Sequence, residues 1–221
     1  MDLTVIKAGY ESFQPGEDDV PDNDVFSSFE QHPNAINDLM RDILKPLGVG
    51  SEYCIAGGSI ISYLNGNGAN DVDVFFKNDE DFKKMSRHLF ETMGAAHYYE
   101  TDFSLGLVLG DVVYDLIKVR KADDPVAVIE GFDFICCKFA YDYRNNVFYY
   151  HHKAPDQLRD KLIEIDWDSA SLQKPYRTID RIVKYSGRGF KIGREELRKV
   201  SRLLNAFDGE VPDVSQGGSG G

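Results

Sequence analysis

A Gly-Gly-Ser triplet and two aspartates fall within one short stretch, Ala56–Phe76, which reads AGGSIISYLNGNGANDVDVFF. Asp71 and Asp73 are one residue apart, so on a β-strand both carboxylates point to the same face, while Val72 points to the other. Carboxylates placed in this way repel each other unless they are solvated or a cation lies between them. Mg²⁺ prefers carboxylate and phosphate oxygens, so this spacing suggests a magnesium site.

The residues upstream of the aspartates have the character of a phosphate-binding turn. Gly57 and Gly58 allow backbone N–H groups to approach a phosphate closely, and the Ser59 hydroxyl can donate a hydrogen bond to a phosphate oxygen. A short helix expected from Ser59 would add its positive N-terminal end. We therefore expect these three residues to bind the phosphates of a nucleotide.

A third carboxylate is found in the apolar run VVYDLIKVR, where Asp115 requires either solvent exposure or a partner. A lone GGS is usually a turn, and a lone DxD is usually a solvated strand end, but the three features together favour a functional site. Asp71 and Asp73 would hold two Mg²⁺ or Mn²⁺ ions, and Asp115 would hold the ion that activates an attacking hydroxyl. This is the arrangement for an in-line displacement that releases pyrophosphate.

Hydrophobic periodicity places these motifs in an α+β domain, with a mixed sheet flanked by helices and followed by a small helical neck. The expected strands cover residues 53–56, 71–76, 105–109, 112–119 and 147–150. The expected helices cover residues 34–46, 59–64, 79–93, 133–142, 155–164, 175–186 and 194–205.

Four segments follow from composition. Residues 1–32 form a loosely structured acidic arm, and residues 33–168 form the domain that carries the aspartates. Residues 169–207 form a basic helical neck. Residues 208–221 form a flexible tail whose GGSGG ending is typical of a linker.

Charge and apolar patterning limit the function classes. The net charge is −12, yet residues 171–204 hold ten basic and three acidic residues, so this lobe can still bind a polyanion. No apolar run approaches the length of a membrane span, and the N-terminus lacks the signal-peptide pattern. The three cysteines lack metal-ligand spacing and are expected to be reduced thiols. We therefore expect a cytoplasmic protein.

The order GGS, DVD and a later aspartate resembles the nucleotidyltransferase superfamily that includes DNA polymerase β. Longer segments are similar to the class II tRNA nucleotidyltransferase and bacterial poly(A) polymerase branch, over about residues 52–192. These segments are GGSIISYLNGNGANDVDVFF, YDLIKVR, DFICCKFAYD, APDQLRDKLIEI and QKPYRTIDRIVKYSGRGFKI.

The resemblance implies transfer of a nucleoside monophosphate from an NTP to an acceptor hydroxyl, in the manner of tRNA processing. It adds Asp133 and Arg177 as nucleotide-binding residues. It also suggests an RNA 3′ end as acceptor, docked on the basic segment 174–202.

Several family positions differ here. Ile61-Ser62 replaces an Arg-Asp pair, Gly131-Phe132 replaces paired arginines, and Gln173-Lys174 replaces Glu-Asp. The choice between CTP and ATP therefore does not carry over. By position, Lys118, Arg120 or Lys138 could replace the arginines. Two alternatives stay open: a catalytically impaired descendant that binds nucleotide or a protein partner, and a nucleotidyltransferase that acts on a protein or small molecule.

Overall fold

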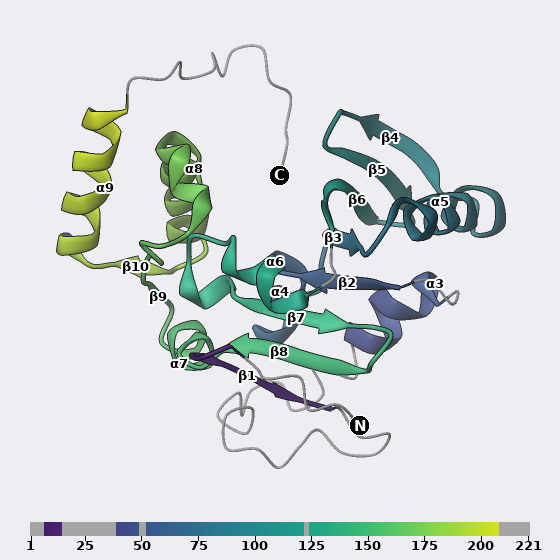
Figure 1. Cartoon of the computed structure of the whole chain (residues 1–221), viewed down its shortest axis with the longest axis horizontal. Helices are drawn as coiled ribbons and strands as arrows, with labels where there is room; N and C mark the ends of the chain where they lie inside the picture. The colour runs from purple at the N-terminus through teal and green to yellow at the C-terminus, as the bar shows by residue number, and fades with distance from the viewer. Residues whose placement is uncertain (1–6, 15–38, 49–51, 122–123, 208–221) are drawn as a thin grey trace.

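The computed structural model describes residues 7–14, 39–48, 52–121 and 124–207, and Figure 1 draws the remaining residues as a grey trace. Most of the expected acidic arm and all of the expected tail lie outside the described residues.

One eight-stranded mixed sheet dominates the fold, with the strand order β1-β8-β7-β2-β3-β6-β5-β4. Strands β3 and β6 are parallel, and the other neighbours are antiparallel. The strands are β1 (Tyr10–Phe13), β2 (Tyr53–Ala56), β3 (Asp71–Phe76), β4 (Ala96–Glu100), β5 (Ser104–Leu109), β6 (Val112–Lys121), β7 (Phe139–Asp142) and β8 (Val147–His151). The α+β class with a mixed sheet is confirmed.

Helices cover both faces of this sheet. Two have cap signals in the sequence: Asn78 accepts a hydrogen bond from the Asp81 N–H at 2.9 Å, and Asp124 precedes Pro125 at a helix start. The helical segments before the neck are a π-helix (Met40–Leu44), α3 (Lys45–Leu47), α4 (Gly58–Leu64), α5 (Asp79–Arg87), a π-helix (His88–Thr92), α6 (Pro125–Glu130), a 3₁₀ turn (Ile135–Cys137) and α7 (Ala154–Arg159).

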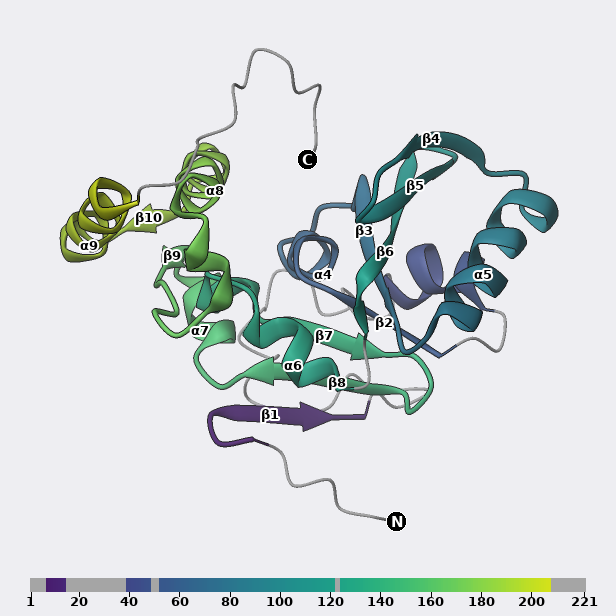
Figure 2. The ribbon, with the colours of Figure 1, turned by 45° about the horizontal axis from the view of Figure 1, so that its top comes forward.

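The neck consists of a 3₁₀ turn (Ala170–Gln173), α8 (Pro175–Gly187) and α9 (Arg194–Ala206), and a small parallel pair joins β9 (Leu162–Ile163) to β10 (Lys191–Ile192). Figures 1 and 2 show α8 and α9 together on one side of the molecule, and β4, β5 and β6 on the other. Strand β3 and helix α4 lie between these two groups in both views.

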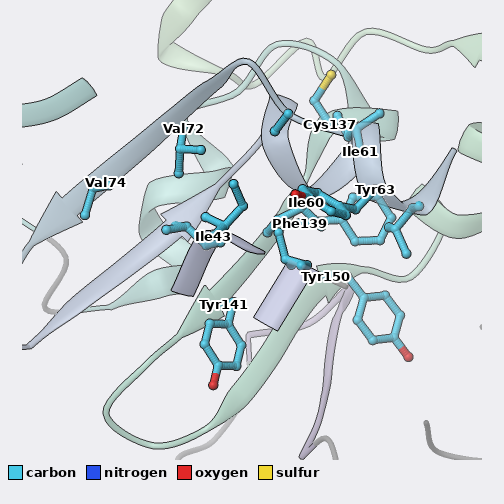
Figure 3. Close-up of a cluster of buried hydrophobic side chains, with 14 of the residues drawn as sticks. Ile43, Ile60, Ile61, Tyr63, Val72, Val74, Cys137, Phe139, Tyr141 and Tyr150 are labelled. Carbon is cyan, nitrogen blue, oxygen red and sulfur yellow. The ribbon is translucent and has the colours of Figure 1, made fainter. Parts of the chain in front are cut away.

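The larger core explains which way the aspartates point. Val72 and Val74 of β3 are fully buried in a cluster with Ile60 and Ile61 of α4 (Figure 3). Because side chains alternate along a strand, this packing turns the intervening residues of β3 to the opposite face. A smaller cluster on that face joins Phe75 to residues of α6.

Several elements differ from expectation. The helix expected over residues 155–164 ends at Arg159 and is followed by strand β9. Tyr10–Phe13, expected in the loose arm, forms the edge strand β1. The helix expected over residues 133–142 is instead a 3₁₀ turn followed by β7, whose four residues are all buried. The apolar run from Phe134 to Tyr141 fits a central strand as well as a buried helix, because periodicity does not separate the two. Strand β4 was not expected at all.

Among the described residues, none of the helices is both long and apolar enough to cross a membrane.

Candidate active site

Asp73 of β3 and Asp115 of β6 are directly opposite each other on neighbouring parallel strands. Asp71 is two residues earlier on the same face, opposite Val113, and is exposed. The structure therefore brings the three predicted acids to one face of the sheet, with two of them as immediate neighbours.

The electrostatics of this pair are unfavourable without a cation. Burial, followed by the charges of Asp115 and Asp71, raises the pKa of Asp73 to about 7, and the charge of Lys184 partly opposes this rise. A carboxyl with so high a pKa is poorly stabilised as an anion. The site therefore favours a ligand that supplies positive charge between the two carboxyl groups.

Two buried polar atoms at the predicted site have no hydrogen-bond partner within the described part of the chain. They are Oδ1 of Asp115 and the Ser59 hydroxyl oxygen. Buried polar groups in proteins are nearly always paired, so each of these atoms is suited to a ligand outside the chain.

The carboxylate oxygens of Asp71, Asp73 and Asp115 fit Mg²⁺ or Mn²⁺. Proteins bind these ions through carboxylate oxygens, while water and substrate phosphates supply the remaining ligands. In the described ranges, no group of three or more His, Cys, Asp or Glu side chains converges closely enough to hold a metal by itself. The fit is therefore to an ion shared with a substrate rather than to a closed structural metal site.

The two glycines of the predicted cradle have different roles. Gly57 has φ +76°, and a Cβ there would lie 3.1 Å from Cε2 of Phe132, so the fold itself requires glycine. A Cβ on Gly58 would meet nothing within 4 Å. Gly58 therefore borders open space at the start of α4, where a ligand could approach the backbone.

Asp133, predicted to bind nucleotide, is buried and engaged inside the protein. Its Oδ2 accepts hydrogen bonds from Nε and Nη2 of Arg181 at 3.0 and 2.8 Å, and from Oγ1 of Thr178 at 2.8 Å. These contacts connect the sheet domain to α8. Arg177, in contrast, is exposed and makes no ion pair with another described residue.

Two of the three bases expected to replace the arginines do not fit that role. Lys138 is fully buried, and its Nζ donates to Oδ2 of Asp166 at 2.5 Å and to the Glu130 carbonyl at 3.0 Å. Lys118 binds Glu100 at 2.7 Å, and strand alternation places it on the face opposite Asp115. The side chain of Arg120 lies outside the described structure.

Lys184 is not among the predicted site residues, yet its charge acts on Asp73. It is exposed and lies seven residues after Arg177 on α8. Seven residues are two helical turns, so the two side chains share one face. This spacing is visible in the sequence, but by itself it is equally typical of a solvated basic helix face.

Solved structures of tRNA-processing enzymes are similar to this chain. The Thermotoga maritima CCA-adding enzyme complexed with tRNA is 17% identical, with a TM-score of 0.59 over 82% of this chain and 45% of that one. A tRNA nucleotidyltransferase complexed with a primer tRNA and an incoming ATP analogue is 20% identical, with a TM-score of 0.57 over 74% and 49%. At such low identity, these likenesses show the nucleotidyltransferase fold.

A curated relative, "Gabija anti-defense 2" of Bacillus phage SPbetaL7, is 24% identical over 160 residues. The match covers 72% of this chain but only 38% of that relative, so this chain spans well under half of the relative's length. The model of the Gabija anti-defense 2 family (Gad2) matches residues 26–161, which is more than half of the chain. The sequence resemblance had indicated the tRNA nucleotidyltransferase branch and had not named this family. With the fold of a tRNA nucleotidyltransferase, the chain belongs to the Gabija anti-defense 2 family.

Proposed function

We propose that this protein is a metal-dependent nucleotidyltransferase, which moves a nucleoside monophosphate from an NTP to an acceptor hydroxyl and releases pyrophosphate. The observation that carries this proposal is the Asp73–Asp115 pair, in direct register on β3 and β6, with Oδ1 of Asp115 buried and unpartnered within the described chain. Neighbouring carboxylates with a buried, unpartnered oxygen have no packing rationale, whereas a metal-bound nucleotide explains both features.

Each residue has a specific role in this proposal. Asp71 and Asp73 would hold the two Mg²⁺ ions, and Asp115 would help to hold the ion that activates the acceptor hydroxyl. Once bound, the ions supply charge that stabilises the attacking and leaving oxygens of an in-line displacement. The Ser59 hydroxyl donates to a phosphate oxygen, and the space beside Gly58 admits the phosphates.

Helix α8 of the neck contributes positive charge to the proposed nucleotide site. The Lys184 charge acts on Asp73 and favours its anion, so it would also favour a phosphate bound there. Arg177 lies two turns earlier on the same helical face and is free to contact the nucleotide. These two bases take the place of the arginines that the sequence lacks.

We propose an RNA 3′ hydroxyl as the acceptor, bound by the basic segment 174–202. Apart from Arg181 and Lys199, which are half-buried, the basic side chains of this segment are exposed. Exposed bases on one lobe of an acidic protein suit a polyanion. This domain would then serve the anti-defense role of the family by adding nucleotides to such an RNA.

A second candidate is nucleotide binding without transfer. Ile61, at a position where the resemblance has arginine, is buried in the main core, and Lys138 is occupied by Asp166. A site that lacks these charges could bind an NTP and yet stabilise the transition state poorly.

One experiment separates the candidates. The purified chain is incubated with Mg²⁺, each labelled NTP in turn, and either an RNA pool or a protein extract, and pyrophosphate release is measured. Transfer predicts pyrophosphate and labelled RNA, both lost in Asp73→Asn but retained in Asp111→Asn, which alters an exposed turn residue. NTP binding by calorimetry without pyrophosphate would favour the second candidate, and labelled protein instead of RNA would reassign the acceptor.

A further inference from the structure

Tyr99 of β4 lies in the same row across the sheet as the acidic pair. The backbone register pairs Tyr99 with Gly106 of β5, Gly106 with Asp115 of β6, and Asp115 with Asp73 of β3. Residues that are directly opposite each other point to the same face of a sheet. The Tyr99 side chain and the two carboxylates therefore share one face, with a glycine between them.

The glycine is what allows Tyr99 to reach the acids. A Cβ on Gly106 would lie 2.5 Å from Cε1 of Tyr99, and 2.7 Å from Cδ1 and from Cζ. The ring thus occupies the space that a side chain on β5 would fill. Gly106 does not have a positive φ, so backbone conformation does not explain the glycine. Two strand spacings are about 10 Å, a span that a long side chain crosses only when the middle strand leaves room.

The Tyr99 side chain is directed over Gly106 toward the Asp115 carboxyl, and the two side chains interact. A phenol can donate a hydrogen bond and a carboxylate only accepts, so the hydroxyl is the donor in this contact. Oδ1 of Asp115 has no partner within the described chain, so the carboxyl group has one interaction with the tyrosine and one oxygen available.

We propose that Tyr99 is a positioning residue for Asp115, whose hydroxyl holds one side of the carboxylate so that Oδ1 is presented to the metal. This inference rests on the proposed function, because it assigns the free oxygen to a metal ion. Partners that fix the orientation of a metal ligand typically contribute 10- to 100-fold to metal affinity.

The test is Mn²⁺ binding, measured by calorimetry and by loss of the free-ion electron paramagnetic resonance signal. Tyr99→Phe keeps the ring over Gly106 and removes only the hydroxyl, and we expect Mn²⁺ affinity to fall roughly 10-fold. In the transfer assay, kcat should fall while the NTP KM stays within about twofold, since the ring and phosphate cradle are intact. Tyr98→Phe is the matched control, because Tyr98 is the neighbouring strand residue and is exposed.

A second variant tests the same contact through the glycine. Gly106→Ala places a methyl group against the Tyr99 ring and should weaken Mn²⁺ binding as Tyr99→Phe does. The double variant should bind no more weakly than Gly106→Ala alone, because both changes remove one interaction. Thermal melting checks that each variant is folded. If Gly106→Ala does not fold, the Mn²⁺ affinity of Tyr99→Phe alone tests the role of Tyr99.

The outcomes separate the inference from the function on which it rests. If Tyr99→Phe binds Mn²⁺ as tightly as the unmodified chain, the role of Tyr99 is refuted while the proposed function stands. If the unmodified chain binds no Mn²⁺ either alone or with NTP and releases no pyrophosphate, the proposed function fails, and the metal-directed role of Tyr99 fails with it. Equal weakening in Tyr98→Phe would show a general effect on β4 and would also overturn the inference.

Discussion

Arg181 of α8 donates two hydrogen bonds, of 3.0 and 2.8 Å, to the same carboxylate oxygen of Asp133. Asp133 is buried, with 3% of its surface exposed, and Thr178 donates to the same oxygen. The pair therefore anchors the neck helix to the sheet domain. In the proposed function Lys184 and Arg177 of this helix contact the nucleotide, so Asp133 would act on nucleotide binding through the position of α8.

Removal of Arg181 should loosen this anchor. Arg181→Ala leaves the Asp133 charge buried without its guanidinium partner, and we expect the free energy of unfolding to fall by about 2–3 kcal/mol, a value reduced because Arg181 is half-exposed. Urea denaturation measures the change. Arg177→Ala is the control on the same helix: it should leave stability within about 0.5 kcal/mol and weaken NTP binding. Equal loss in both variants would contradict the anchoring role.

Asp73→Asn should stabilise the metal-free protein. Because the pKa of Asp73 is raised to about 7 in the folded state, the ionised carboxylate costs stability as pH rises from its unfolded pKa through 7. At pH 8 the amide should therefore increase the free energy of unfolding by about 1–3 kcal/mol. It should also abolish the Mg²⁺-dependent rise in Tm. Melting curves with and without Mg²⁺ at pH 8 measure both effects, and a Tm that still rises with Mg²⁺ would place the metal elsewhere.

The two glycines of the cradle should respond in opposite ways to alanine. Gly57→Ala forces a side chain into a positive φ and against Phe132, and should destabilise the fold by about 1–2 kcal/mol. Gly58→Ala meets no protein atom and should leave stability unchanged or slightly higher. Its methyl group would occupy the space proposed for phosphate, so NTP affinity should fall. Calorimetric NTP titration measures this; unchanged affinity in Gly58→Ala would exclude phosphate from this space.

Acid should weaken the edge of the sheet through His151. Burial, followed by the charges of His152 and Lys138, lowers the pKa of His151 to about 4. The unfolded chain takes up this proton near pH 6.5, so the stability contributed by the neutral ring falls as pH drops from 6.5 toward 4. We expect about 1–2 kcal/mol over this range after allowance for partial exposure.

Chemical denaturation at pH 7 and pH 4.5 tests this dependence. His151→Gln should lose less stability on acidification than the unmodified protein, whereas His97→Gln, on the exposed strand β4, should behave like the unmodified protein. The same acid dependence in His151→Gln would assign the effect to another group.

The alternation of polar and apolar residues was sufficient to predict on which face of the strand Asp71 and Asp73 lie. Strand alternation predicts that Asp71 and Asp73 share a face, and the buried valines between and after them confirm it. The hairpin of β5 and β6 and the two neck helices are also close to their predicted bounds, because turn residues and helical periodicity mark them locally.

Long-range pairing could not be predicted in this way. The direct register of Asp73 with Asp115 depends on the parallel pairing of β3 and β6, which no local signal determines. The β7 strand was taken for a helix because its residues are buried on both faces. Tyr99 was missed for a similar reason: its reach to Asp115 depends on a glycine of the intervening strand.

The outer strand β1 has a consequence for how the domain is completed during synthesis. It pairs with β8 along its whole length, and Tyr150 donates to Glu11 across a separation of 139 residues. Pairings between such distant residues form slowly, because a long loop must close first. A nascent chain that ends before β8 would leave the edge of β7 without its neighbour. Unpaired strand edges recruit other chains, so we expect fragments that stop before residue 147 to aggregate where the longer chain stays dispersed.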